Sequence, residues 1–167
     1  MRKTLPFICS LTALVLWSSL ASAQQANVPL KQYYGASSGD NFSAATAAGA
    51  LAAEEAFYQY TRTEGFIFST KVSGTEALKL YYSDDTGDNY TTTAGEGDRE
   101  AKTFGYRYIR DEGYIYAQSK PGTVALKLFY SDLTGDNYTT ASADGEAEAL
   151  AAGYHFVRIE GYVFPAP

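Results

Sequence analysis

The tripeptide Gly-Asp-Asn occurs three times in the chain, and the pattern Arg-x-Glu-Gly follows each copy. The tripeptides are Gly39-Asp40-Asn41, Gly87-Asp88-Asn89 and Gly135-Asp136-Asn137. The later pattern supplies Arg62 and Glu64, Arg110 and Glu112, and Arg158 and Glu160. Because a guanidinium group is a planar fork of N–H donors, each arginine can pair with the nearby glutamate or with the aspartate of the tripeptide. We therefore predict structural ion pairs at these six residues.

Aromatic side chains give these motifs a second interpretation, which is sugar binding. All 15 tyrosines follow residue 23, and an aromatic residue stands opposite the leucines in three alternating runs. Exposed rings would stack on a sugar while neighbouring Asp and Asn groups bind its hydroxyls. The predicted ligand-binding residues are Tyr33, Asp40, Asn41, Tyr81, Asp88, Asn89, Phe129, Asp136 and Asn137. The alternative is that the rings are strand residues packed beneath helices.

Metal binding and catalysis have less support in the sequence. Asp84, Asp85, Asp88 and Asn89 could offer oxygen atoms to calcium, but their spacing is not that of an EF-hand loop, so we expect no metal or other cofactor. His155 is the only histidine, and no Gly-x-Ser-x-Gly motif is present. Three like copies favour repeated binding over one asymmetric active site. We therefore expect no enzyme, with glycoside hydrolysis by two carboxylates as the remaining catalytic alternative.

Each Gly-Asp-Asn tripeptide also begins an Asn-x-Ser/Thr sequence. In a eukaryotic source, Asn41, Asn89 and Asn137 would be glycosylation acceptors on a loop. All three arise from one repeated motif, so they count as a single observation.

The motifs belong to three repeats with a constant spacing of 48 residues. Leu30, Leu78 and Leu126 stand at one end of the repeats, and no gap is needed between copies. We define the repeats as residues 30–77, 78–125 and 126–167 and expect them to form a single domain after a short N-terminal segment, residues 24–29.

The second repeat shows which elements each copy should contain. Residues 78–82 alternate apolar and polar side chains, which predicts a strand, and residues 89–92 read as its return after a turn at residues 83–88. Residues 96–104 are a helix candidate, with Thr93 and Glu96 as a capping box and Gly105 just beyond the helix end. Residues 106–116 form two strand-like runs around Gly113.

A repeat of this size cannot bury its apolar face alone, so the three copies must close on one another. We predict a mostly β fold with one short helix per repeat, closed as a pseudo-threefold, β-trefoil-like barrel. Because a helix in each repeat is unusual for a trefoil, a three-bladed propeller-like arrangement and a novel threefold α+β fold remain alternatives.

The N-terminal residues predict secretion. Arg2 and Lys3 precede an apolar run at residues 5–20, and the small residues 21–23 fit a signal-peptidase site. That run is shorter than the roughly 20 residues of a spanning helix, so we expect cleavage of residues 1–23 and an extracellular or periplasmic protein without a membrane partner. Cleavage takes the net charge from −6 to −8, which argues against nucleic acid. It also removes the only cysteine. We expect a monomer.

The sequence around GDNYTT and the later Glu-Gly-Tyr-Val-Phe resembles a secreted, tyrosine-rich repeat family of unknown function. Its members typically read Leu-Tyr-Arg-Tyr-Tyr, then Gly-Asp-His-Phe-Tyr-Thr-Thr, then Gly-Tyr and Glu-Gly, and the resemblance spans residues 30–164. The family module occurs alone or joined to secreted cell-wall hydrolases, which implies an accessory binding role. This chain departs from the pattern because Asn41, Asn89 and Asn137 stand where the family has histidine.

Three functions from different classes follow from these observations. The first is a secreted, non-catalytic module that binds carbohydrate or a cell-wall polymer through up to three equivalent weak sites, which gain affinity together. The second is a structural or protein-interaction domain in which the repeated polar residues only hold the repeats together. A small glycosidase is the third. Exposed rings at Tyr81 and Phe129 would favour binding, and covered rings would favour the structural role.

Overall fold

The computed structural model describes residues 28–93 and 95–167. The predicted signal, residues 1–23, lies outside the described residues, as do residues 24–27 of the N-terminal segment. None of the helices within the described ranges is long and apolar enough to cross a membrane.

Each repeat contains the same four elements in the same order: two strands, a short helix and a third strand. The first strand of each repeat begins two or three residues before the boundary drawn from the sequence. The first has β1 (Val28–Gly35), β2 (Asp40–Ala44), α1 (Ala47–Glu55) and β3 (Gln59–Ile67). The second has β4 (Thr75–Tyr82), β5 (Asn89–Thr93), α2 (Glu96–Thr103) and β6 (Arg107–Tyr116). The third has β7 (Val124–Tyr130), β8 (Asn137–Thr140), α3 (Ala143–Ala151) and β9 (His155–Val163).

Within a repeat the first strand lies between the other two, and all pairs are antiparallel. The first repeat is a three-stranded sheet, β2-β1-β3, and the other two join into a six-stranded sheet, β5-β4-β6-β9-β7-β8. The expected mostly β chain with one short helix per repeat is confirmed. Strand pairing alone, in two separate sheets, does not show the closed β-trefoil-like barrel that the sequence suggested.

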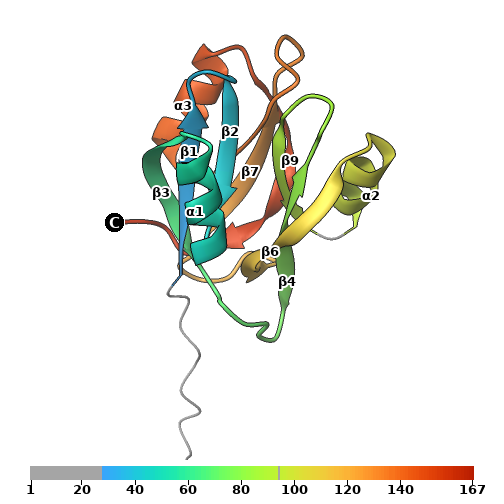
Figure 1. Ribbon diagram of the computed structural model, residues 1–167. Coiled ribbons are helices and arrows are strands. Elements are labelled where there is room, and N and C mark those ends of the chain that lie inside the picture. The colour runs from blue at the N-terminus through green and yellow to red at the C-terminus, as the bar shows by residue number, and fades with distance from the viewer. Residues whose placement is uncertain (1–27, 94) are drawn as a thin grey trace, which may run out of the picture.

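Each first strand is buried on both faces. One leucine from each of these strands (Leu30, Leu78 and Leu126) packs in a central cluster with Ile67, Ile115 and Val163. The helices are spaced around the outside of the strands (Figure 1) and cover the opposite face, where Ala53, Ala101 and Ala149 meet the strand aromatics. Regular alternation is broken because the pairing with the third strand shifts register twice in every repeat, as it does in β4 after Leu78 and after Leu80.

The helices begin in two different ways. Thr46 caps α1 and Ser142 caps α3, each through a side-chain oxygen that accepts a bond from a backbone N–H three residues later. The capping box predicted at Thr93 and Glu96 is wrong, because Gly95 is the N-cap of α2. Thr93 instead donates its hydroxyl and its backbone N–H to Glu160 in the third repeat.

The ends of the third strands bind one another. Pairs of backbone hydrogen bonds join Phe66 to Phe164 and Phe68 to Tyr114, and β6 pairs with β9 at Tyr116 and Tyr162. The glycine of each Arg-x-Glu-Gly pattern permits this approach. A Cβ on Gly113 would lie 2.7 Å from the carbonyl oxygen of Phe68. The third strand of every repeat therefore contacts its counterparts in both other repeats.

Candidate functional site

The Gly-Asp-Asn tripeptides come together at the centre of the molecule, where each aspartate binds the asparagine of another repeat. Asp40 accepts hydrogen bonds from the backbone N–H and the Nδ2 of Asn89, both at 2.9 Å. The same two bonds run from Asn137 to Asp88 at 3.0 and 2.8 Å and from Asn41 to Asp136 at 3.0 and 2.8 Å. Because each repeat donates to one neighbour and accepts from the other, the bonds form a closed ring.

A tyrosine from the same repeat completes the hydrogen bonding of each carboxylate. Its hydroxyl donates to Asp40 from Tyr58 (2.7 Å), to Asp88 from Tyr106 (2.6 Å) and to Asp136 from Tyr154 (2.6 Å). The turn before each aspartate contains a glycine with positive φ, for instance Gly87 at 80°, which lets the chain reverse and enter the next strand. All three aspartates are buried.

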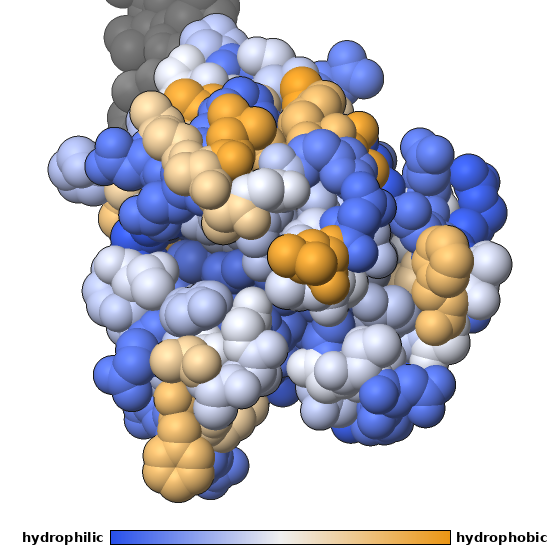
Figure 2. Space-filling model, turned by 90° about the horizontal axis from the view of Figure 1, so that it is seen from above, coloured by the Kyte–Doolittle hydropathy of each residue, from blue (hydrophilic) through white to orange (hydrophobic). Residues whose placement is uncertain are grey.

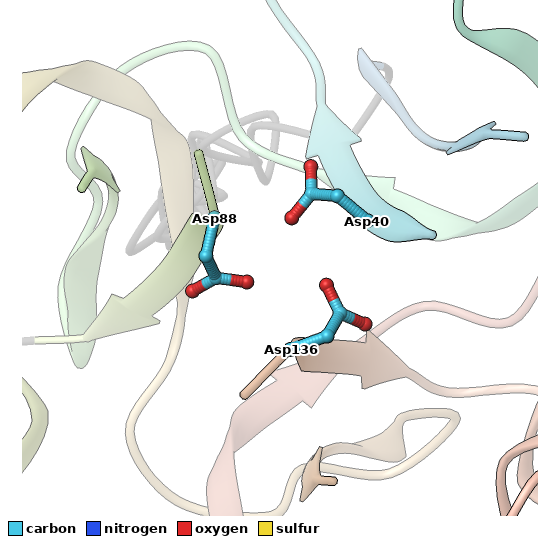
Figure 3. A group of neighbouring side chains, drawn as sticks. All are labelled: Asp40, Asp88 and Asp136. Atoms are coloured by element: carbon cyan, nitrogen blue, oxygen red, sulfur yellow. The ribbon is translucent and has the colours of Figure 1, made fainter. Parts of the chain in front are cut away.

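The three carboxylates converge from the start of β2 and from the residues just before β5 and β8 (Figure 3). One oxygen from each of Asp40, Asp88 and Asp136 lies within 4.8 Å of the other two. Burial, reinforced by a hydrogen bond to Asp136 and the charge of Asp88, raises the pKa of Asp40 from its ordinary 3.8 to about 9. Burial also raises the pKa of Asp88 to about 6, against the lowering effect of its bonds from Tyr106 and Asn137.

This arrangement can hold protons or a hard cation. Three negative charges in a buried space repel one another, so folding favours a state in which part of that charge is neutralised. Carboxylate oxygens are also the ligands that Ca²⁺ and Mg²⁺ prefer. This convergence was not predicted from the sequence, because only oxygen ligands within a single loop were considered. The repeat itself was the available signal, since identical residues of three packed repeats can meet around one axis.

The asparagines are not suited to carry glycans. Asn89 and Asn137 are buried, and the Nδ2 atom that a glycan would occupy donates to an aspartate in all three tripeptides. A glycan at Asn41, Asn89 or Asn137 would break this ring, so the glycosylation predicted for a eukaryotic source does not fit the fold.

The Arg-x-Glu-Gly residues make a second set of contacts between repeats. The arginines lie in ion-pair contact with the glutamate two positions later, for Arg62–Glu64 at 3.4 Å, Arg110–Glu112 at 2.6 Å and Arg158–Glu160 at 2.8 Å. Each glutamate also accepts bonds from another repeat. Glu112, for example, accepts at 2.8 Å from the backbone N–H groups of Ala45 and Thr46 and from the Thr46 hydroxyl. These arginines bind glutamates and not the aspartates of the tripeptides.

The aromatic residues predicted to stack on a sugar lie in the core. Tyr33, Tyr81 and Phe129 are buried, because the register shift turns this position inward and the helix covers it. The expectation that these three rings face solvent is therefore corrected. The Tyr81 hydroxyl donates to Asp98 at the start of α2, which fixes the helix over the strand.

A different ring faces outward at one equivalent position in every repeat. Tyr60, Tyr108 and Phe156 lie on the third strands and are 54%, 52% and 50% exposed. Each packs edge to face on the buried ring beneath it, with centroids 5.8 to 6.0 Å apart. In the first repeat the ring borders a hollow of about 410 Å³ that Lys31 and Glu54 also line.

Grooves between neighbouring repeats are also lined by tyrosines. One groove of about 440 Å³ lies between the second and third repeats and includes Tyr90, Glu100 and Asn137. Another of about 460 Å³ lies between the third and first repeats and includes Tyr138, Glu148 and Asn41. Of the predicted ligand-binding residues, Asn41 and Asn137 thus border grooves, whereas the aspartates point to the centre. On the face seen in Figure 2, apolar side chains form separate groups among hydrophilic ones.

Comparison with known proteins identifies one matching family. A family model described as a domain of unknown function (DUF5648) matches residues 17–164. Neither the curated proteins nor the solved structures contain a significant match.

Proposed function

The chain belongs to the DUF5648 family, and we propose that it is a secreted, non-catalytic module that binds carbohydrate through one outward aromatic ring in each repeat. The observation that carries this proposal is the recurrence of Tyr60, Tyr108 and Phe156, each half-exposed and supported by a buried ring. The ring itself recurs and the hydroxyl does not, since the third copy is phenylalanine. Stacking on the face of a sugar needs the ring alone.

The proposed sites act together on a pseudo-threefold molecule. The Asp–Asn ring, the glutamate contacts and the joined strand ends all support closure of the three repeats about one axis. A polymer that engages more than one ring gains affinity from the high effective concentration of the second site. We propose that the secreted protein is a monomer, because its three repeats already supply this multivalency.

A second candidate is a structural domain without a sugar site. The observation that favours it is that the most regular polar residues are used in contacts between repeats, as the Asp–Asn ring shows. On this view the outward rings would serve contact with a protein partner.

Binding to a glycan array and to insoluble polysaccharides separates the two candidates. The protein without residues 1–23 should bind, and the combined variant Tyr60→Ala, Tyr108→Ala and Phe156→Ala should lose about tenfold or more in apparent affinity. The matched control is Leu51→Ala, Leu133→Ala and Leu150→Ala, which also removes three exposed apolar side chains and should bind as the wild type does. No binding by the wild type, or equal binding by the aromatic variant in its folded form, would refute the proposal.

A further inference from the structure

Two of the three recurring arginines bind side chains of a neighbouring repeat. Arg158 donates to Glu100 at 2.7 Å, to the Tyr90 hydroxyl and to Thr92, all in the second repeat. Arg62 donates to the Glu148 carboxylate and the Tyr138 hydroxyl in the third repeat. With its own glutamate, each arginine thus lies between two carboxylates and a phenol hydroxyl.

The third arginine, Arg110, has lost these partners together. At the positions of the phenol, the threonine and the groove glutamate, the first repeat carries Phe42, Ala44 and Ala52. All three replacements are apolar, and all three pack in one cluster with Leu80, the residue paired with Arg110 in the sheet. The arginine and its bond from Nε to Glu112 at 2.6 Å remain.

This change leaves a buried donor unsatisfied. Within the described residues, Nη2 of Arg110 is buried and has no hydrogen-bond partner. An unsatisfied donor on a charged group is costly. Nη2 itself is covered, but the side chain as a whole is 23% exposed, so solvent reaches other atoms of it. Arg110 therefore pairs with one carboxylate, whereas Arg62 and Arg158 each pair with two.

We propose that Arg110, at the contact between the first and second repeats, binds the carboxylate of an acidic sugar. This inference rests on the proposed carbohydrate binding and names the class of sugar. The partners of Arg62 and Arg158 show what fits this guanidinium, namely a carboxylate with a hydroxyl beside it. A uronic acid carries both groups on one ring. The sugar carboxylate would accept a charge-assisted bond from Nη1 of Arg110, which has no partner among the described residues and is not among the buried unpaired atoms.

The test uses the methyl glycosides of glucuronic and galacturonic acid, with their uncharged methyl esters as paired probes. Binding is followed by NMR shifts of the ¹⁵N-labelled protein without residues 1–23. The acids should bind at least about tenfold more tightly than the esters, and Arg110→Gln should remove this difference. Arg107→Gln, which alters an arginine paired with Asp84 on the surface, should preserve it.

A second variant avoids weakening the fold. Ala52→Glu supplies the carboxylate that the equivalent residues Glu100 and Glu148 supply elsewhere, so it should occupy Arg110, abolish uronate binding and raise the unfolding temperature. Leu51→Glu adds the same charge at the neighbouring exposed position and should do neither.

The outcomes separate this inference from the proposed function. Equal binding of acids and esters, or uronate binding that survives both Arg110→Gln and Ala52→Glu, would overturn the role of Arg110. Loss of neutral glycans in the aromatic variant would then still support the outward rings. Uronate binding that depends on Arg110, in a protein that binds no glycan through those rings, would support the arginine site alone.

Discussion

Phe57 is the one residue other than glycine that adopts a positive φ within the described parts of the chain, at 61°. It follows Ala56, the C-cap of α1, and glycine stands at the equivalent positions, Gly105 after α2 and Gly153 after α3. The left-handed conformation crowds the Cβ of any L-residue other than glycine. The first repeat therefore carries local strain that the other two avoid.

Replacing this residue by glycine should stabilise the protein. Left-handed strain costs about 1–2 kcal/mol, and the greater entropy that glycine loses on folding offsets about 0.5–1 kcal/mol of the gain. The ring is 84% exposed, so little packing is lost. We expect Phe57→Gly to raise the free energy of unfolding by up to about 1 kcal/mol, measured by urea denaturation.

Phe57→Ala separates strain from the effect of an exposed ring, because alanine retains the strain. It should not stabilise the protein, and Gly105→Ala should destabilise it by about 1 kcal/mol. An equal gain from Phe57→Ala and Phe57→Gly would contradict the strain explanation.

At the scale of elements, the start of α1 depends on a glutamate from another repeat. Glu112 accepts bonds from two N–H groups and a hydroxyl around Thr46, which itself caps the helix. Removing this carboxylate leaves those donors and the Arg110 charge without a partner. We expect Glu112→Ala to lower the free energy of unfolding by about 3–5 kcal/mol, measured by chemical denaturation.

The control for this variant is an ion pair on the surface. Arg107 and Asp84 lie 2.8 Å apart with both side chains more than half exposed, so Asp84→Ala should cost less than about 1 kcal/mol. Similar losses in the two variants would show that the glutamate contact contributes no more than a surface charge pair.

Most elements of each repeat could be predicted from the sequence, because turn residues and alternation are local signals. The two runs expected around Gly113 instead form one continuous strand, β6. The helix expected at residues 96–104 corresponds to α2, Glu96–Thr103. The burial of Tyr81 could not be predicted from alternation, because it depends on the register shift in β4 and on cover from the helix. The convergence of Asp40, Asp88 and Asp136 depends on how the repeats pack, which no local spacing encodes.

At the scale of the whole molecule, hydrogen bonds between repeats form a closed ring around the centre. Besides the Asp–Asn ring, two hydroxyls on the second strands donate to backbone carbonyls of a neighbouring repeat, from Thr91 to Ser43 and from Thr139 to Thr91. The hydroxyl of Ser43 donates at 2.6 Å to Gln32 in its own repeat. In the Asp–Asn ring every repeat has one donor and one acceptor link. Loss of one repeat would leave two others with unsatisfied buried groups, so we infer that the three repeats fold as one cooperative unit.

The aspartates at this centre should make the stability depend on pH. The raised pKa of Asp40, about 9 against an ordinary 3.8, means that the folded state holds a proton that the unfolded state has released. This contribution is fully present below about pH 4 and is lost as the pH rises to about 9, with Asp88 contributing up to about pH 6. The free energy of unfolding should therefore fall between pH 6 and 9, by at most about 1.4 kcal/mol per pH unit for each proton.

Asp40→Asn tests the origin of that slope, because its amide cannot ionise. Urea unfolding of this variant between pH 6 and 9 should show a smaller decrease than the wild type, while Asp84→Asn, on the surface, should leave the slope unchanged. A stability that is constant over this range would contradict proton uptake at the centre. Ca²⁺ can be added at pH 9 to both proteins. If it raises the free energy of unfolding of the wild type but not of Asp40→Asn, the three carboxylates hold a cation in place of the proton.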